Sequence, residues 1–240
     1  MKHNKPKVSI IIRTKNEARW ISSCLLSLTQ QDFDGDIELI IVDSNSTDNT
    51  LELAKEFDVS VLRYPDKDFN YSKSLNIGCR NSKGDILVFL SAHCIPLNTK
   101  WLFNLVKDLK SENIVATYGR QIPTVDSDPF NSRDLLTVFG VESKVQKKDF
   151  FFHNANSAIL KSAWEKLNFD EGVNGLEDRV WAKTLFQKRL GYIKYVSDAV
   201  VYHEHGLNHS NNPERAKRVA LVLKKLHDDD VLKGYKLLNE

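Results

Sequence analysis

The sequence predicts an α/β fold with a mainly parallel sheet in its first half and a mixed arrangement in its second half. Short β-branched runs alternate with helical patterns in the first half, which is the order of a parallel sheet with helices between its strands. The runs IELIIVD at 37–43 and DILVFL at 85–90 are apolar without alternation, as expected for strands covered on both faces. No Gly/Ser-rich or Pro-rich linker interrupts the 240 residues, so a single domain is predicted.

The elements follow from the spacing of apolar residues along the chain. β-Branched or continuous apolar runs predict strands at 7–14, 37–43, 59–64 and 85–90. Apolar residues at helical spacing predict helices at 19–31, 46–57 and 98–109. After Gly119 the pattern loosens into the polar loop PTVDSDPFNSRD and then into short strands and helices.

Composition excludes several classes of protein. The hydrophobic fraction is 41% and the charged fraction 28%, and no apolar run reaches the roughly 20 residues of a membrane span. A formal charge of +2 gives no reason to expect nucleic-acid binding. Cys24, Cys79 and Cys94 form no CxxC pair and predict reduced thiols. The start MKHNKPKVSIII has no small-residue cleavage site of a signal peptide, so a cytoplasmic protein is expected.

Polar side chains follow three of the predicted parallel strands, where ligands bind in open α/β sheets. They are Arg13, Thr14, Asn16 and Glu17 after the first strand, Asp43, Ser44 and Ser46 after the second, and Ser91 and His93 after the run at 85–90. The turn after the first strand has no glycine, which excludes a GxGxxG dinucleotide motif, and no Walker loop is present. We therefore expect side chains, rather than a glycine-rich loop, to hold a nucleotide.

Four motifs in sequence resemble the inverting, GT-A-fold glycosyltransferases of family 2. They are VSIIIRTKNE, IELIIVDSNSTDNT, the strand-end motif SAHCIP with the following WL, and the stretch from GLEDRVW to VVYHEH. The chain departs from the family pattern at Arg13, at Ser44 and at SAH, which replaces the usual Asp-x-Asp. The resemblance implies one GT-A domain with a nucleotide-sugar-binding half at 1–105, an acceptor and catalytic half at 106–206, and a helical extension at 207–240.

The resemblance also implies a reaction. The chain would move a sugar from a nucleotide-diphosphate sugar, with a UDP-sugar favoured, to a hydroxyl of a glycan or lipid-linked acceptor, in surface polysaccharide or glycolipid synthesis. An alternative of another class stays open because SAH lacks carboxylates: a non-catalytic module that binds a sugar nucleotide or glycan. The presence of Glu177, Asp178, His203 and His205 favours an enzyme, since a binding module needs no base.

Residues for the nucleotide are carried over from the family's motifs one by one. They are Thr14, Glu17, Asp43 and Ser91 at the strand ends, and Lys73 and Asn76 in YSKSLNIG. For Asp43 a structural alternative is a strand-to-helix turn in which Ser46 is the helix N-cap.

The SAH motif raises the question of a metal. The second carboxylate of the family's Asp-x-Asp aligns with His93, and polypeptide N-acetylgalactosaminyltransferases use a related Asp-x-His motif together with a later histidine. Here VVYHEH offers His203 and His205 on one face of a strand. We expect these histidines to bind a divalent cation, Mn²⁺ or Mg²⁺, with imidazole favouring Mn²⁺. Metal-independent transfer, with histidines and basic residues neutralising the diphosphate, stays open.

Inverting transfer needs a base for the acceptor hydroxyl. By resemblance, Asp178 is that base, and Glu177 orients the acceptor or serves as a second carboxylate. The alternative is helix capping, because acidic residues are common in the first turn of a helix.

The segment FFHNANSAILKSAW is expected to border the acceptor, as in the family. His153, Asn154 and Asn156 are polar among aromatic residues, a composition suited to stacking on a sugar and to hydrogen bonding. The alternative is that these aromatic residues belong to the core.

The C-terminal stretch PERAKRVALVLKKLHDDDVLKGYKLL has the pattern of a basic, partly amphipathic helix. Two roles are open for it: peripheral contact with an anionic membrane, or packing on the body of the protein with solvated lysines.

Overall fold

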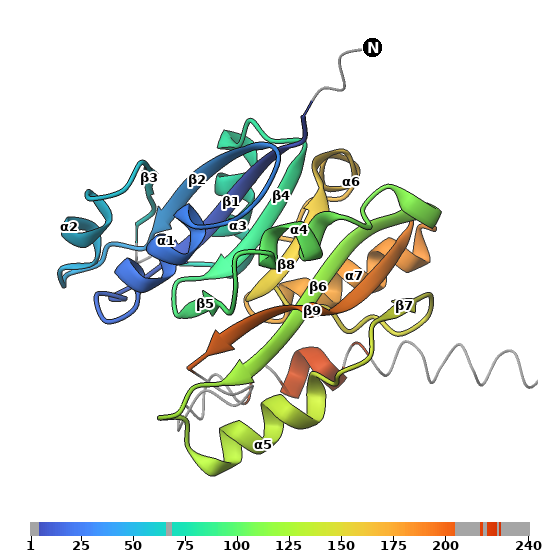
Figure 1. Cartoon of the computed structure of the whole chain (residues 1–240). Helices are drawn as coiled ribbons and strands as arrows, with labels where there is room; N and C mark the ends of the chain where they lie inside the picture. Colours follow the sequence, from blue (N-terminus) through green and yellow to red (C-terminus); the bar gives the residue numbers. More distant parts are fainter. Residues whose placement is uncertain (1–4, 66–68, 205–216, 218–219, 225, 227–240) are drawn as a thin grey trace, which may run out of the picture.

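The structure of the chain is a computed structural model, and it describes residues 5–65, 69–204, 217, 220–224 and 226 (Figure 1). Within these residues a single sheet has the strand order β3-β2-β1-β4-β8-β6-β9-β5, and β7 pairs with β9. The predicted α/β fold with a parallel first half and a mixed second half is confirmed.

The parallel half consists of four strands and the helices between them. The strands are β1 (Lys7–Thr14), β2 (Asp36–Asp43), β3 (Ser60–Arg63) and β4 (Ile86–Ser91). The helices are α1 (Ile21–Thr29), α2 (Thr50–Ala54) and α3 (Tyr71–Asn81). Both β2 and β4 run parallel to β1, which they flank. Polar loops at the carboxyl ends of these strands therefore meet at one edge.

The mixed half begins after β4. Its strands are β5 (Cys94–Pro96), β6 (Ile114–Pro123), β7 (Lys144–Gln146), β8 (Asn156–Leu160) and β9 (Tyr192–His203). Its helical elements are α4 (Trp101–Val106), the 3₁₀ turn η2 (Ser111–Asn113), α5 (Pro129–Val138), α6 (Lys161–Lys166) and α7 (Glu177–Gln187). In Figure 1, α5 lies at the lower edge beside the end of β6.

The antiparallel pairing of β5 with β9 brings the end of β9 to the edge at which β1, β2 and β4 end. Cys94 lies opposite His203 in this pairing, so a residue from the last strand is brought next to the strand-end motif that contains His93. Meanwhile β8 runs antiparallel to β4, which brings the segment before Asn156 to the same edge. The topology therefore collects residues from distant parts of the sequence.

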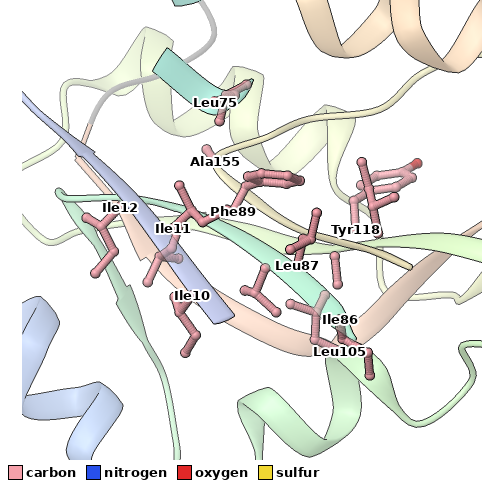
Figure 2. Close-up of a cluster of buried hydrophobic side chains, with 14 of the residues drawn as sticks. Ile10, Ile11, Ile12, Leu75, Ile86, Leu87, Phe89, Leu105, Tyr118 and Ala155 are labelled. Atoms are coloured by element: carbon pink, nitrogen blue, oxygen red, sulfur yellow. The ribbon is translucent and has the colours of Figure 1, made fainter. Parts of the chain in front are cut away.

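The core lies between the sheet and the helices that cover it. Figure 2 shows Ile10, Ile11 and Ile12 of β1 beside Leu87 and Phe89 of β4. Each of these five side chains is at most 1% exposed. Burial of an aliphatic or aromatic side chain of this size stabilises a fold by about 1.5–3 kcal/mol. This rigid layer holds the loops at the strand ends in place.

Three expectations from composition concern the whole chain. Cys24, Cys79 and Cys94 are buried as thiols. In the described part of the chain, no helix has the length and hydropathy that crossing a bilayer requires. Of the predicted C-terminal helix, residues 220–224 and 226 are described and helical, and the buried Leu226 accepts a hydrogen bond from Lys183 of α7 through its carbonyl oxygen. That contact supports packing on the body.

Candidate active site

The loops after β1 and β2 are tied together by hydrogen bonds from backbone amides of one loop to side-chain oxygens of the other. The pairs are Asn16 N to Ser46 Oγ, Glu17 N to Thr50 Oγ1, and Ala18 N to Asp48 Oδ2. Three such bonds satisfy amides that would otherwise face the turn unpaired. They fix the backbone that presents the Glu17 side chain.

Asp43 and Thr14, expected on the nucleotide, form hydrogen bonds inside this loop pair. Asp43 is 1% exposed, and its carboxylate accepts hydrogen bonds from the Thr14 hydroxyl at 2.8 Å, the Ser46 hydroxyl at 2.6 Å and the Ser46 amide at 2.9 Å. These two residues shape the loop, and their direct contact with a nucleotide stays a prediction. Ser46 is also not a helix cap, because the N-cap of α2 is Asn49.

Asn76, also expected on the nucleotide, is held by hydrogen bonds within the fold, and its nucleotide contact stays a prediction. It is 1% exposed on α3, where its Oδ1 accepts from Trp164 Nε1 and its Nδ2 donates to the Phe169 carbonyl oxygen. Its amide thus connects α3 to α6 and the loop that follows. Lys73, exposed on the first turn of α3, and Ser91, half-buried at the end of β4, stay predictions for the nucleotide.

The predicted histidines meet at the edge. His93 Nδ1 lies 2.9 Å from Glu17 Oε1, and the nucleotide contact expected of Glu17 stays a prediction. The rings of His93 and His203 stack, with centroids 5.2 Å apart and planes inclined by 10°. His203 is buried, and its Nδ1 lies 2.7 Å from Gln121 Oε1. Two residues that are far apart in sequence therefore form one pair.

The histidine pair does not by itself complete a metal centre. Among the described residues, no group of three His, Cys, Asp or Glu side chains has the arrangement to hold an ion. His205, the third predicted ligand, lies outside the described residues. The pair therefore supplies at most two protein ligands from the described part of the chain.

The carboxylates of Glu177 and Asp178 occupy the first turn of α7 and are both buried, at 5% and 8% exposure. Neither caps the helix: the N-cap is Leu176, with φ 59°, and no side chain makes a cap hydrogen bond. Asp178 accepts instead from the backbone amides of Asn154 and Arg179. The capping alternative is therefore not supported by the geometry.

Electrostatics of the carboxylate pair favour the protonated state. Burial, and then the neighbouring charge of Asp178, raise the pKa of Glu177 from 4.5 to about 7, while Arg13 opposes the shift. Burial likewise raises the pKa of Asp178, opposed by its hydrogen bond from Asn154. Arg13 Nη1 lies 3.5 Å from Glu177 Oε1, and the Arg13 guanidinium lies over the Tyr71 ring. The site thus holds two buried carboxyl groups, on which the positive charges of Arg13 and Arg179 act.

Of the three residues expected at the acceptor, two lie in the site. His153 Nδ1 lies 3.1 Å from Gln121 Nε2, and Asn154 is 3% exposed beside Asp178. Within the described residues, Asn154 Nδ2 has no hydrogen-bond partner. The acceptor contact of Asn156 stays a prediction: its Nδ2 donates to the carbonyl oxygens of Arg120 and Ala199, and its Oδ1 accepts from Trp101 Nε1. Both the nitrogen and the oxygen of the Asn156 side chain are therefore hydrogen-bonded within the fold.

Two residues of the site were missed by sequence reasoning. Arg13 carried a signal, since it replaces the proline usual in the family, but its contact with Glu177 joins residues from opposite halves of the chain. Gln121 carried none, because a single glutamine within a strand resembles any other polar residue of a sheet.

The sequence of this chain is similar to those of known proteins. The model of a protein family described as glycosyl transferase family 2 matches residues 9–168. The O-antigen chain rhamnosyltransferase RfbN of Salmonella typhimurium is 29% identical over 212 residues, which cover 83% of this chain and 67% of RfbN.

Solved structures show the same fold. The mannosyltransferase PcManGT from Pyrobaculum calidifontis, in complex with GDP-Man and Mn²⁺, matches with a TM-score of 0.64 at 24% identity, over 84% of this chain and 57% of that one. TarS 1-349 of S. aureus, in complex with UDP-GlcNAc, matches with a TM-score of 0.68 at 17% identity, over 86% of this chain and 61% of that one. This chain therefore spans about two thirds or less of the length of each of these proteins.

Proposed function

This chain belongs to glycosyl transferase family 2 and has a GT-A fold, and on that premise we propose that it is an inverting glycosyltransferase. It transfers a sugar from a nucleotide-diphosphate sugar to a hydroxyl acceptor in the synthesis of a surface polysaccharide or glycolipid. The similarity to RfbN, an O-antigen chain rhamnosyltransferase, supports that setting.

The buried carboxylate pair carries the proposal. Placing Glu177 and Asp178 side by side out of water disfavours their ionised forms, as the raised pKa values of both groups indicate. Burying two neighbouring carboxylates lowers the stability of the folded state, and a module that only binds a ligand needs no such base. A raised pKa makes the ionised carboxylate a stronger base. Such a group suits a reaction in which the acceptor hydroxyl must lose its proton.

In the proposed reaction Asp178 is the base. The acceptor oxygen attacks the anomeric carbon from the face opposite the diphosphate, so a new C–O bond forms as the bond to the diphosphate oxygen breaks. The acceptor proton passes to Asp178, and the configuration at the anomeric carbon inverts. Arg13 holds Glu177 in place, and Glu177 orients the acceptor. Backbone and side chain of Asn154 keep Asp178 and the acceptor aligned.

The two stacked histidines supply part of the ligands that a divalent cation needs. His93 and His203 would hold it, with the donor's diphosphate as a further ligand, and imidazole nitrogens favour Mn²⁺ over Mg²⁺. When bound, the ion would offset the negative charge of the leaving diphosphate. The Mn²⁺ complex of PcManGT supports this assignment. In the alternative, the two histidines neutralise the diphosphate by hydrogen bonds alone.

In the proposed donor site, Ser91 and Lys73 contact the nucleotide. Glu17 orients His93 by a hydrogen bond, and Thr14 and Asp43 hold the shape of the loop. A UDP-sugar is the first donor to test, supported by the UDP-GlcNAc complex of TarS, and a GDP-sugar the second, supported by PcManGT. His153 and Asn154 face the proposed acceptor, a glycan or lipid-linked sugar.

Thermal stability with a panel of UDP-, GDP- and dTDP-sugars tests the donor site. A true donor binds the folded state and raises its stability by mass action, by about 2.7 kcal/mol when its concentration is 100-fold above Kd. We expect one nucleotide class to raise Tm and His93→Ala to reduce that rise. A panel in which no nucleotide sugar shifts Tm, with or without Mn²⁺, would contradict the proposal.

A further inference from the structure

Gln121 lies between two histidines of the site and is fully buried. Its Oε1 is 2.7 Å from His203 Nδ1, and its Nε2 is 3.1 Å from His153 Nδ1. Gln121 and Pro123 share one face of β6, and Pro123 is the register partner of His203 in β9. The pairing shifts register between Gly119 and Gln121, and such irregularities re-aim side chains next to active sites.

The orientation of the Gln121 amide sets the direction of this row of hydrogen bonds. Its Nε2, which can only donate, faces His153 Nδ1, so His153 Nδ1 is the acceptor. Its Oε1, which can only accept, faces His203, so His203 Nδ1 carries the hydrogen. The Ala155 N–H also points to His153 Nδ1, at the longer distance of 3.4 Å, and agrees with this direction.

The other histidine of the stacked pair reaches the same state independently. Its Nδ1 faces Glu17 Oε1 at 2.9 Å, and an ionised carboxylate only accepts hydrogen bonds. His93 therefore carries its hydrogen on Nδ1, as His203 does. In a neutral imidazole the lone pair then belongs to Nε2, and a metal ligand must be the nitrogen without the hydrogen.

We propose that Gln121 is a positioning residue that gives two histidines of this site opposite chemical roles. Its oxygen holds His203 in the Nδ1–H tautomer, so that Nε2 of His203, like Nε2 of His93, is a ligand for a divalent cation. Its nitrogen holds His153 in the Nε2–H tautomer, so that His153 donates a hydrogen bond to substrate oxygen and does not ligate. The ligand role of His203 rests on the proposed function, whereas the tautomers themselves do not.

This arrangement explains why His93 and His203 would ligate the ion whereas His153 would not. Ligating histidines commonly donate their other ring hydrogen to a carboxylate or carbonyl, which orients the ring and makes the ligating nitrogen more basic. Glu17 and Gln121 fill that role for the stacked pair. The Gln121 oxygen is the group that holds the hydrogen of His203 on Nδ1.

The first test is the tautomer pattern, read from long-range ¹H–¹⁵N correlations of protein labelled with [¹⁵N]histidine, free of metal and above pH 8. Single His→Gln variants assign the signals. We expect Nδ1–H for His93 and His203 and Nε2–H for His153. A wild-type spectrum with His203 as Nε2–H would overturn the proposal, with no need for metal, donor or activity.

Two substitutions at Gln121 distinguish the role of its side-chain oxygen from the role of its side-chain nitrogen. Gln121→Glu keeps an accepting oxygen for His203 but offers His153 an acceptor in place of a donor, so His153 alone should change to Nδ1–H. Gln121→Met removes both groups at similar volume, so His203 should lose its fixed tautomer. The matched control is Gln146→Met, which removes another buried amide, bonded to the carbonyl oxygens of Asp149 and Phe151. That control should leave the three histidine signals unchanged.

The second test is Mn²⁺ affinity without substrate, from the electron paramagnetic resonance signal of unbound Mn²⁺. Substitutions behind a metal ligand typically cost 10–100-fold in affinity, and we expect that loss for Gln121→Met but not for Gln121→Glu or Gln146→Met. Unchanged affinity in Gln121→Met would overturn the ligand-positioning role. If wild type binds no Mn²⁺ either alone or with a nucleoside diphosphate added, the metal part of the proposed function fails, and the tautomer pattern alone decides the role of Gln121.

Discussion

At the scale of single residues, the adjacent carboxyl groups of Glu177 and Asp178 dominate the electrostatics of the site. Both are buried at the start of a helix that they do not cap, and Arg13 forms an ion pair with Glu177. Burial acts against the ionised form of each group, while Arg13 and the amide of Asn154 act for it. The balance leaves Glu177 with a pKa near that of water-exposed histidine.

This balance predicts how stability depends on pH. The pKa of Glu177 rises on folding from 4.5 to about 7, so the folded state binds more protons than the unfolded state between these values. The stability from the protonated carboxyl is complete below about pH 4.5 and lost as pH rises to about 7. In Glu177→Gln that loss should be absent, so its Tm relative to wild type should rise across this window. A pH-independent difference in Tm would show that Glu177 does not titrate there.

His93 offers a second prediction at this scale. If His93 ligates the ion, His93→Ala should abolish stimulation by Mn²⁺, whereas His93→Asp, which restores an oxygen ligand, should keep activity and shift the preference toward Mg²⁺. Activity of wild type should also disappear in chelator and return with Mn²⁺. Undiminished transfer in excess chelator, together with damage from His93→Asp by repulsion of phosphate, would favour the metal-independent alternative.

At the scale of elements, the site depends on close contact between β6, β8 and β9. Gly119 of β6 sits where a Cβ atom would come within 2.1 Å of the Ala199 carbonyl oxygen and 2.4 Å of Asn156 Nδ2. Those two atoms are hydrogen-bonded to each other, so neither can move away easily. The absence of a side chain at this position lets the strand that carries Gln121 pass close to β9.

Gly119→Ala should therefore destabilise the protein, by about 1–3 kcal/mol if the strands shift to relieve the clash. The matched control is Gly140→Ala, because a Cβ atom there meets no atom within 4 Å. Urea denaturation of both variants gives the comparison. Equal stability of the two variants would mean that β6 and β9 are not packed as described.

The sequence predicted the strands and helices better than it predicted the contacts between them. Continuous apolar runs were enough for β2 and β4, and the polar residues after the strands did meet at one edge. The sequence could not reveal that Asn76 and Asn156 are buried hydrogen-bonding residues, since an amide in a motif looks the same whether it meets a ligand or a backbone carbonyl. Nor could it reveal Gln121, whose role exists only because β6 lies beside β9.

At the scale of the whole molecule, the fold brings groups from six segments to the carboxyl edge of the sheet. Arg13 lies near the end of β1 and Glu17 follows it, His93 follows β4, Gln121 comes from β6, His153 precedes β8, His203 ends β9, and Glu177 and Asp178 begin α7. The stacked histidines His93 and His203 lie at one end of this set and the carboxylates of α7 at the other, with His153 and Asn154 between them. This order matches a donor diphosphate beside the stacked histidines and an acceptor hydroxyl beside Asp178.

Turnover of the donor in Asp178→Asn tests the central claim most directly. The nucleotide sugar that raises Tm is supplied with water or an added glycan as acceptor, and release of the nucleoside diphosphate is followed for wild type and variant. Loss of a general base should lower turnover by roughly 10²–10⁴-fold, while the donor still raises Tm of the variant as it does for wild type. Near wild-type turnover in a folded, donor-binding Asp178→Asn would contradict the account.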